Sequence, residues 1–99
     1  MTNKLIWDEP IDDNELDKEV EYGSIYYKKG TSIVHRTKGP AAIYSDGYEY
    51  WLQNGLYHRL DGPAWELANE YKVWYYKGKR IDCSSQQEFE KLIKLKAFW

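Results

Sequence analysis

Residues 22–83 alternate between apolar and polar side chains in short runs, and Gly-containing turns separate these runs. A period of two is the pattern of a β-strand with two different faces, and β-branched and aromatic residues strengthen it. Asp46-Gly47 and Asn54-Gly55 are dipeptides that favour tight hairpin turns. The pattern predicts strands at residues 24–27, 32–34, 42–44, 48–52, 64–67 and 71–76. The expected fold is therefore mainly β, a meander of antiparallel hairpins.

Several of the expected strands carry apolar residues on both faces. In residues 71–76, for example, Tyr, Val and Tyr alternate with Lys, Trp and Tyr. A sheet that is apolar on both sides buries one side against another element. We expect a helix, a partner or a second copy of the chain on that side.

The chain repeats itself at a fixed interval. The string HRLDGPA of residues 58–64 follows the string HRTKGPA of residues 35–41 by 23 positions. The same interval separates Trp51 and Gly55 from Trp74 and Gly78, while residues 26–30 form a looser first copy two positions early. A fixed period of this length indicates a tandem repeat, in which equivalent residues lie on one surface. Residues 22–83 are thus expected to fold as tandem β-hairpin units.

A helical pattern follows the last hairpin. Phe89, Leu92 and Ile93 recur at helical spacing, and Ser85 and Glu88 have the spacing of a capping box. The end units of a repeat stack expose an apolar face and need a cover. We expect residues 84–99 to be a capping segment, with a helix over residues 84–97.

Residues 1–21 form an acidic N-terminal segment. Residues 8–21 hold eight acidic side chains and one Lys, whereas residues 22–99 hold twelve basic and eight acidic side chains. Residues 4–7 fit a short strand. Residues 12–22, with Asp13 or Asn14 as N-cap, fit a short helix or a solvated acidic arm. The acidic run either confers solubility or docks onto a basic surface of a partner or of this chain.

Composition narrows the class of protein. The net charge of −2 argues against a general nucleic-acid binder, and the single Cys excludes an internal disulfide. No apolar run approaches the ~20 residues that a membrane helix requires, so we expect a cytoplasmic protein without a membrane partner. Ten Tyr and five Trp in 99 residues suit thin sheets and binding faces.

The repeated polar residues are the candidate site. We call His35, Arg36, His58 and Arg59 the His/Arg ladder, because tandem units place them in line, with Lys38 and Asp61 nearby. Arg binds phosphate through a two-pronged fork, and aromatic rings stack bases. The alternative is structural: each His bonds a turn carbonyl, each Arg stacks on an aromatic ring, and Arg59 also pairs with Asp61. The aromatic residues of the candidate binding site are Tyr44, Tyr50, Trp51, Tyr57 and Trp74.

The combination of Trp51, Asn54-Gly55, His58 and Gly62 resembles the MORN repeat, a family of 23-residue aromatic- and glycine-rich β-hairpins. The string from His58 to Ala64 also resembles small repeat proteins of tailed bacteriophages, many of which end in a similar helix. MORN repeats mostly serve as scaffolds and interaction modules. The resemblance to the phage proteins implies a protein that acts on host factors, among them the components of defence systems.

Three functional hypotheses follow. The first is a non-enzymatic interaction module that binds a host protein through its aromatic sheet face. The second is a sponge that binds a nucleotide or oligonucleotide through the His/Arg ladder. The third is a phosphodiesterase-like enzyme, since two His residues with nearby carboxylates can act as acid and base, although no catalytic motif is present. We expect no cofactor and no metal, and we expect a homodimer because an open sheet edge invites pairing.

Overall fold

The computed structural model describes residues 16–68 and 70–95. Its strands are β1 (Leu16–Val20), β2 (Gly23–Lys28), β3 (Ala42–Tyr44), β4 (Tyr48–Tyr50), β5 (Leu52–Gln53), β6 (Leu56–Tyr57), β7 (Trp65–Leu67), β8 (Tyr71–Tyr76) and β9 (Lys79–Ile81). One helix follows, α1 (Gln86–Leu95). The strand expected at residues 4–7 and residues 96–97 of the expected helix lie outside the described residues.

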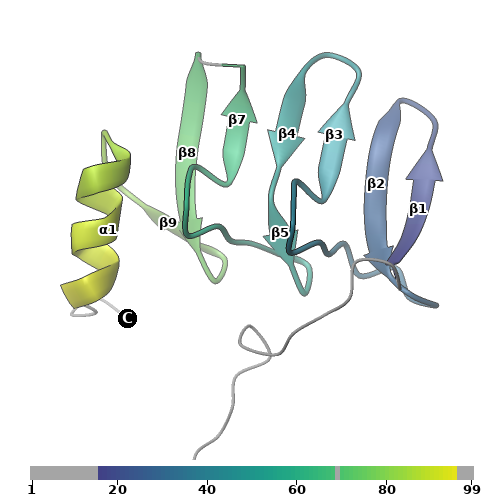
Figure 1. Cartoon of the computed structure of the whole chain (residues 1–99), viewed down its shortest axis with the longest axis horizontal. Helices are drawn as coiled ribbons and strands as arrows, with labels where there is room; N and C mark the ends of the chain where they lie inside the picture. Colours follow the sequence, from purple (N-terminus) through teal and green to yellow (C-terminus); the bar gives the residue numbers. More distant parts are fainter. Residues whose placement is uncertain (1–15, 69, 96–99) are drawn as a thin grey trace, which may run out of the picture.

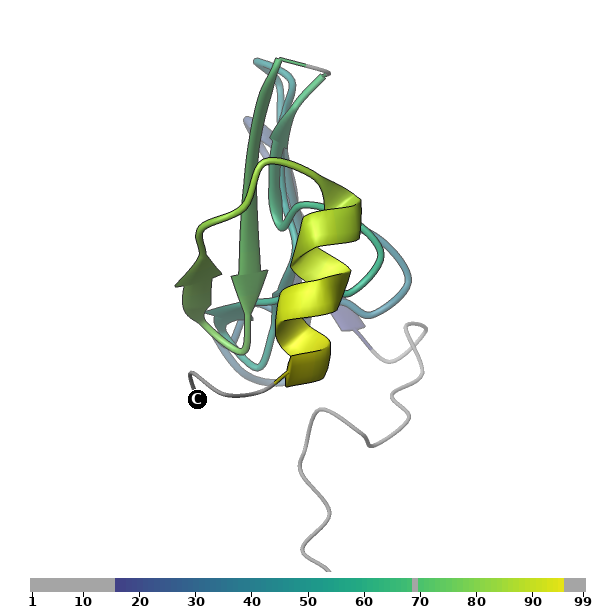
Figure 2. The same ribbon diagram turned by 90° about the vertical axis from the view of Figure 1, so that its left-hand side faces the viewer.

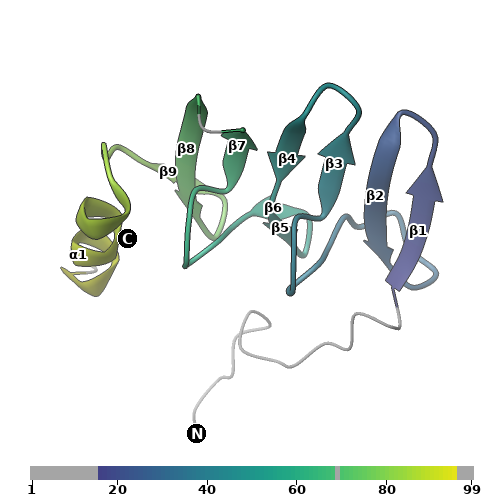
Figure 3. The same ribbon diagram turned by 45° about the horizontal axis from the view of Figure 1, so that its top comes forward.

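Seven strands form one antiparallel sheet in the order β1-β2-β3-β4-β7-β8-β9, and β5 pairs with β6 as a separate hairpin. Three hairpins stand side by side in a row that ends at α1 (Figure 1; Figure 3). The molecule extends only 16 Å along its shortest axis. The predicted mainly-β meander of tandem hairpins with a C-terminal helix is confirmed.

The units are equivalent in their backbone contacts. The amide of His35 donates to the carbonyl of Tyr26, and the amide of His58 donates to that of Trp51, both at 3.0 Å. In the last unit Trp74 pairs with Ile81, which stands 23 positions after His58. The segment from Tyr26 to His35 is two residues longer than the segment from Trp51 to His58, which explains why Tyr26 comes early in the repeat.

Tight turns close the hairpins where the sequence predicted them. Asn54 and Gly55 both have positive φ, at 54° and 79°, and the equivalent Lys77 and Gly78 have φ of 49° and 84°. Two consecutive residues of positive φ make the hairpin turn whose twist matches that of the flanking strands. The turn at Lys77 forms without the Asn that favours this conformation, so the repeat fixes the turn even where the residue is unfavourable.

The N-terminal expectation is wrong for residues 16–20. These residues are neither a helix nor an arm, because β1 pairs along its whole length with β2, from Leu16 opposite Lys28 to Val20 opposite Ser24. The carboxylate of Asp17 also accepts a hydrogen bond of 2.8 Å from the amide of Gly30. Long-range pairing thus overrides the weak helical pattern of a short acidic segment.

Two strand boundaries also differ from the prediction. Residues 32–34 contribute a single bridge, between Tyr27 and Val34, instead of a strand. The strand expected over residues 48–52 divides at Trp51 into β4 and β5, because the amide of Trp51 donates to Ala64 while Leu52 pairs with Tyr57. The chain turns here from the main sheet into the small hairpin.

Helix α1 closes the last unit, and Figure 2, which looks along the row from that end, shows it in front of the end of the sheet. Phe89 is fully buried with Trp74 and Ile81, and partly buried residues surround this cluster: Tyr76, Cys83, Leu92 and Ile93. The amide of Glu88 donates to the hydroxyl of Ser85 at 3.1 Å, as a capping box requires. The Glu88 carboxylate accepts from the amide of Ser84, at 2.7 Å, one residue before the usual partner.

Candidate functional site

Each Arg of the His/Arg ladder is held between an aromatic ring and a glycine. Cζ of Arg59 lies 3.7 Å from the centre of the Trp51 ring. On its other side, a Cβ added to Gly62 would lie 2.6 Å from Cζ. Cζ of Arg36 lies 4.1 Å from the Tyr26 ring centre, and a Cβ at Gly39 would be 3.0 Å away. The glycine of the repeated string is therefore required because the guanidinium lies directly against it.

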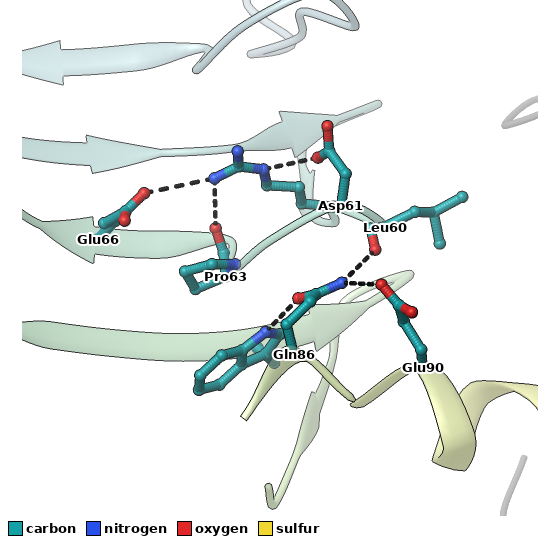
Figure 4. Close-up of polar contacts among 8 residues, drawn as sticks. Leu60, Asp61, Pro63, Glu66, Gln86 and Glu90 are labelled. Carbon is teal, nitrogen blue, oxygen red and sulfur yellow. Dashed lines mark hydrogen bonds and ion pairs between the residues drawn. The ribbon is translucent and has the colours of Figure 1, made fainter. Parts of the chain in front are cut away.

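Hydrogen bonds from the nitrogen atoms of the same guanidinium groups fix their orientation between ring and glycine. Nη1 of Arg59 donates to the carbonyl of Pro63 at 3.1 Å, and Nη1 of Arg36 donates to that of Pro40 at 3.2 Å. Nε of Arg59 also donates to Asp61 at 2.8 Å, and Glu66 accepts at 3.4 Å (Figure 4). The arginine, glycine and proline of the repeated string thus form one interlocked unit.

Each His of the ladder joins its own unit to the next. Nδ1 of His35 accepts from the amide of Asn54 at 2.8 Å, and Nδ1 of His58 accepts from the amide of Lys77 at 2.9 Å. His35 and His58 are only 1% and 5% exposed. In both units the turn therefore supplies an amide hydrogen to Nδ1. The imidazole accepts here, so Nδ1 carries no proton.

The Arg59–Gly62 contact predicts strong coupling between two substitutions. Arg59→Ala is expected to lower the free energy of unfolding by ~2 kcal/mol, through the lost ring contact and hydrogen bonds. Gly62→Ala should cost about as much, because its methyl group displaces the guanidinium from bonds that cannot form elsewhere. In the Arg59→Ala background nothing needs displacing, so Gly62→Ala should cost under about 0.5 kcal/mol. Urea unfolding of the four proteins measures the coupling, and additive costs would show that the two residues do not interact.

Burial and the charge of Lys77 lower the pKa of His58 from 6.5 to about 4. The folded state therefore excludes a proton that the unfolded chain binds. The stability from this group is fully present above pH 6.5, is lost as the pH falls toward 4, and changes no further below that. Between pH 7 and 4.5 the loss should be on the order of 2 kcal/mol. His58→Asn, whose carbonyl can accept from Lys77, should show a smaller decline in urea unfolding between pH 7 and 4.5; equal slopes would contradict the assignment.

The predicted aromatic residues divide between two sides of the sheet. Tyr50 lies in register with Trp65, and Tyr48 with Leu67, so these side chains share one side. Rings in contact follow this side, with centroids 5.1 to 6.1 Å apart. We call this cluster the tyrosine face, and it consists of Tyr44, Tyr48, Tyr50, Tyr57, Trp65 and Tyr75. It carries three of the predicted binding residues.

The other predicted residues lie away from the tyrosine face. Trp51 lies under Arg59 on the opposite side. Trp74 is 7% exposed beneath α1, and its Nε1 donates to Gln86 at 2.8 Å. Gln86 also donates to the carbonyl of Leu60 and to Glu90 (Figure 4). In the last unit Trp74 is thus bound by Gln86, whereas its equivalent Trp51 is covered by Arg59. Trp74 is part of the packing under α1 and does not contribute to a binding surface.

Two hollows lie on opposite sides of the sheet. A groove of about 530 Å³ opens on the tyrosine face, and its lining residues are Ile25, Tyr27, Val34, Ala42, Tyr44, Tyr50, Leu52, Tyr57 and Trp65. A second hollow of about 370 Å³ lies at the ladder, between Trp51, Arg59, Asp61, Tyr76 and Lys77 among others. The first is aromatic and uncharged, whereas the second mixes cations with a carboxylate.

Tyr48, Trp65 and Tyr75 belong to the tyrosine face but are not among the binding residues predicted from the sequence. Period-two alternation puts Trp65 on the same side of its strand as Leu67, and Tyr48 on the same side as Tyr50. The strand register that brings these sets together was the unknown. Register, which the single sequence leaves open, is what joins six rings into one surface.

Comparison with known protein families, with curated protein sequences and with solved structures gave no match. Within residues 16–68 and 70–95, no group of three or more His, Cys, Asp and Glu side chains is placed to hold a metal ion. Over the same part of the chain, no helix is long and apolar enough to cross a membrane.

Proposed function

We propose that this protein is a non-enzymatic interaction module that binds a protein partner through the tyrosine face. The observation that carries the proposal is the continuous set of six contacting rings on the side of the sheet that α1 leaves uncovered. The helix packs on Trp74 and Tyr76, which alternate with Tyr75 and point to the other side. Large rings with a polar tip are the side chains that most often dominate protein interfaces.

The geometry of the ladder supports the same choice. The guanidinium of Arg59 has one side on Trp51, the other on Gly62, and donates to Pro63, Asp61 and Glu66. A group that holds the units together in this way has little left for a ligand. These contacts favour a structural role for Arg59 and leave the tyrosine face as the candidate binding surface.

The resemblance to small phage repeat proteins directs the proposal to a partner. On that resemblance we place the protein in the cytoplasm of a bacterial host, where it binds and inhibits a host factor such as a defence protein. The partner's surface would cover the tyrosine face, which is flat because it is one side of a single sheet.

Affinity capture from bacterial lysate tests the tyrosine face against the rest of the surface. Tyr44→Ala removes a ring that is 38% exposed on the tyrosine face, and Leu60→Ala removes an exposed apolar side chain at the ladder hollow. Both proteins should melt within a few degrees of the wild type. A stoichiometric partner that is retained by Leu60→Ala and lost by Tyr44→Ala supports the proposal. The reverse pattern would contradict it.

The hollow at the ladder favours a second candidate, the nucleotide sponge. Trp51 and Tyr76 offer rings there, and Arg59 and Lys77 offer positive charge. Lys77→Gln removes one charge without touching the Arg59 contacts. If the hollow holds a phosphate, calorimetric titration with mono-, di- and cyclic nucleotides should give binding that this variant weakens about tenfold. Absence of heat at millimolar nucleotide would exclude the candidate.

Self-association through the sheet edge is part of the proposal. Strand β1 is the terminal strand of the seven-stranded sheet, so its outer side is an edge within the described residues. Edge strands offer unpaired backbone groups to a second copy, and β1 carries both signs of charge, with Lys18 between Asp17 and Glu19. Light scattering at micromolar concentration should give the mass of a dimer, and a monomer mass would remove this part.

A further inference from the structure

The tyrosine face continues into an acidic border. Strand β1 lies beside β2 with Asp17 opposite Tyr27 and Glu19 opposite Ile25, so both carboxylates project on the side of the groove. Oε1 of Glu19 accepts a hydrogen bond of 3.1 Å from the hydroxyl of Tyr27, a residue that lines the groove. Carboxylates therefore directly adjoin the aromatic surface.

A small pocket connects the border to the groove. It has a volume of about 80 Å³, and its lining residues are Glu19, Glu21, Tyr22, Gly23, Ile25 and Tyr44. Ile25 and Tyr44 also line the groove, so the small pocket and the groove share these two residues as a wall. Tyr22 and Tyr44 are 74% and 38% exposed. The pocket thus combines two carboxylates with two accessible rings.

Charge on the tyrosine face is one-sided near the groove. The residues that line the groove are all uncharged, and the neighbouring pocket adds carboxylates only. Burial and the carboxylate of Glu19 raise the pKa of Tyr27, and burial and Tyr57 raise that of Tyr50. Phenols of raised pKa stay neutral at physiological pH. A bound cation would meet ring faces, phenol oxygens and carboxylates, with no repelling charge among the lining residues.

The opposite side of the sheet shows how this chain uses such rings. There Arg36 and Lys18 lie over Tyr26, and Arg59 lies over Trp51. Within the described residues, no Lys or Arg lies over the rings of Tyr44, Tyr50 or Tyr57. In that part of the chain, Lys and Arg side chains cover rings on one side of the sheet and leave the groove rings uncovered.

We propose that the partner presents a basic extended segment to this surface, with Arg or Lys side chains over the groove rings and in the Glu19/Glu21 pocket. This inference rests on the proposed function and specifies the chemistry of the partner. Ring faces attract cations through their quadrupole, and carboxylates add direct attraction. An acidic or purely apolar segment would leave Glu19 and Glu21 beside it without compensation.

Peptide titration tests the charge requirement with the full-length protein. The probe is a capped twelve-residue peptide of alternating Arg and Thr, and its matched control replaces each Arg with the uncharged isostere citrulline. The Arg peptide should bind at least tenfold more tightly than the citrulline peptide, with affinity that falls as salt rises. Equal affinities, or no binding of the Arg peptide, would overturn the inference.

Paired variants locate the effect on the surface. Glu19→Gln with Glu21→Gln should weaken binding of the Arg peptide about tenfold. Glu49→Gln with Glu70→Gln makes the same change in net charge, on the opposite side and in the β7–β8 turn, and should change binding less than twofold. Equal effects of the two pairs would show general attraction to net charge and overturn the assigned pocket.

The outcomes separate this inference from the function on which it rests. Capture of a lysate partner that Tyr44→Ala abolishes, but that Glu19→Gln with Glu21→Gln leaves intact, would retain the tyrosine face and reject the basic partner. Capture that is insensitive to Tyr44→Ala would reject the function itself. If the uncharged citrulline peptide dissociated a dimer of the chain, the surface would serve self-association, and the basic partner would be rejected.

Discussion

Replacing Phe89 with Ala should lower the free energy of unfolding by ~3–4 kcal/mol. Phe89 is fully buried, and it is the residue by which α1 covers Trp74 and Ile81. The molecule is one sheet thick, so neighbouring layers cannot collapse into the space that the ring leaves. The expected result is a large drop in the urea concentration at the unfolding midpoint. The Trp fluorescence of the folded protein should also shift to longer wavelength, because Trp74 becomes more exposed.

Leu95→Ala is the control for Phe89. Leu95 lies on the same helix but is 69% exposed, so its loss should cost under about 0.5 kcal/mol. A cost below about 1 kcal/mol for Phe89→Ala would contradict the role of α1 as the cap of the repeat.

Gly23→Ala should be nearly as damaging, with a cost of ~3 kcal/mol. Gly23 begins β2 with φ of 148°, and it lies in register with Tyr44 on β3. An added Cβ would overlap the carbonyl oxygen of Ile43 and lie 2.7 Å from Cα of Tyr44. These are backbone atoms of a paired strand, so relief requires that the first hairpin separate from the second.

Gly30→Ala separates strain from overlap. Gly30 also has a positive φ, of 74°, but an added Cβ would meet nothing within 4 Å. Its substitution should cost only about 1 kcal/mol. Thermal unfolding of both variants measures the difference, and equal costs would mean that close packing of β2 on β3 does not matter.

The sequence predicted the repeat because its signals are local and occur twice. The strings at residues 35–41 and 58–64, and the Asn54-Gly55 turn, specify hairpins without knowledge of any distant contact. The repeat also indicates that Ile81 takes the place of His58 in the last unit. A unit that has no successor needs no turn amide to bind, so an apolar residue replaces the imidazole.

The rest depended on contacts between distant residues. Strand β1 has apolar residues only at its ends, and its stability comes from pairing with β2 and from contacts such as Glu19 with Tyr27. Gln86 covers Trp74 through a side-chain bond whose geometry no spacing rule encodes. The predicted binding residues lie on two sides of the sheet for the same reason. Tyr57 and His58 are neighbours in the sequence, but their rings point to opposite sides and contact Tyr75 and Tyr76.

The most direct measurement of the central claim is site-specific photocrosslinking in bacterial cells. A benzophenone amino acid replaces Tyr44 on the tyrosine face in one protein and Leu60 at the ladder hollow in another. The account predicts a discrete protein adduct from position 44 and none from position 60. An adduct from position 60 alone would show that the partner binds the ladder side and that the tyrosine face is not the binding surface.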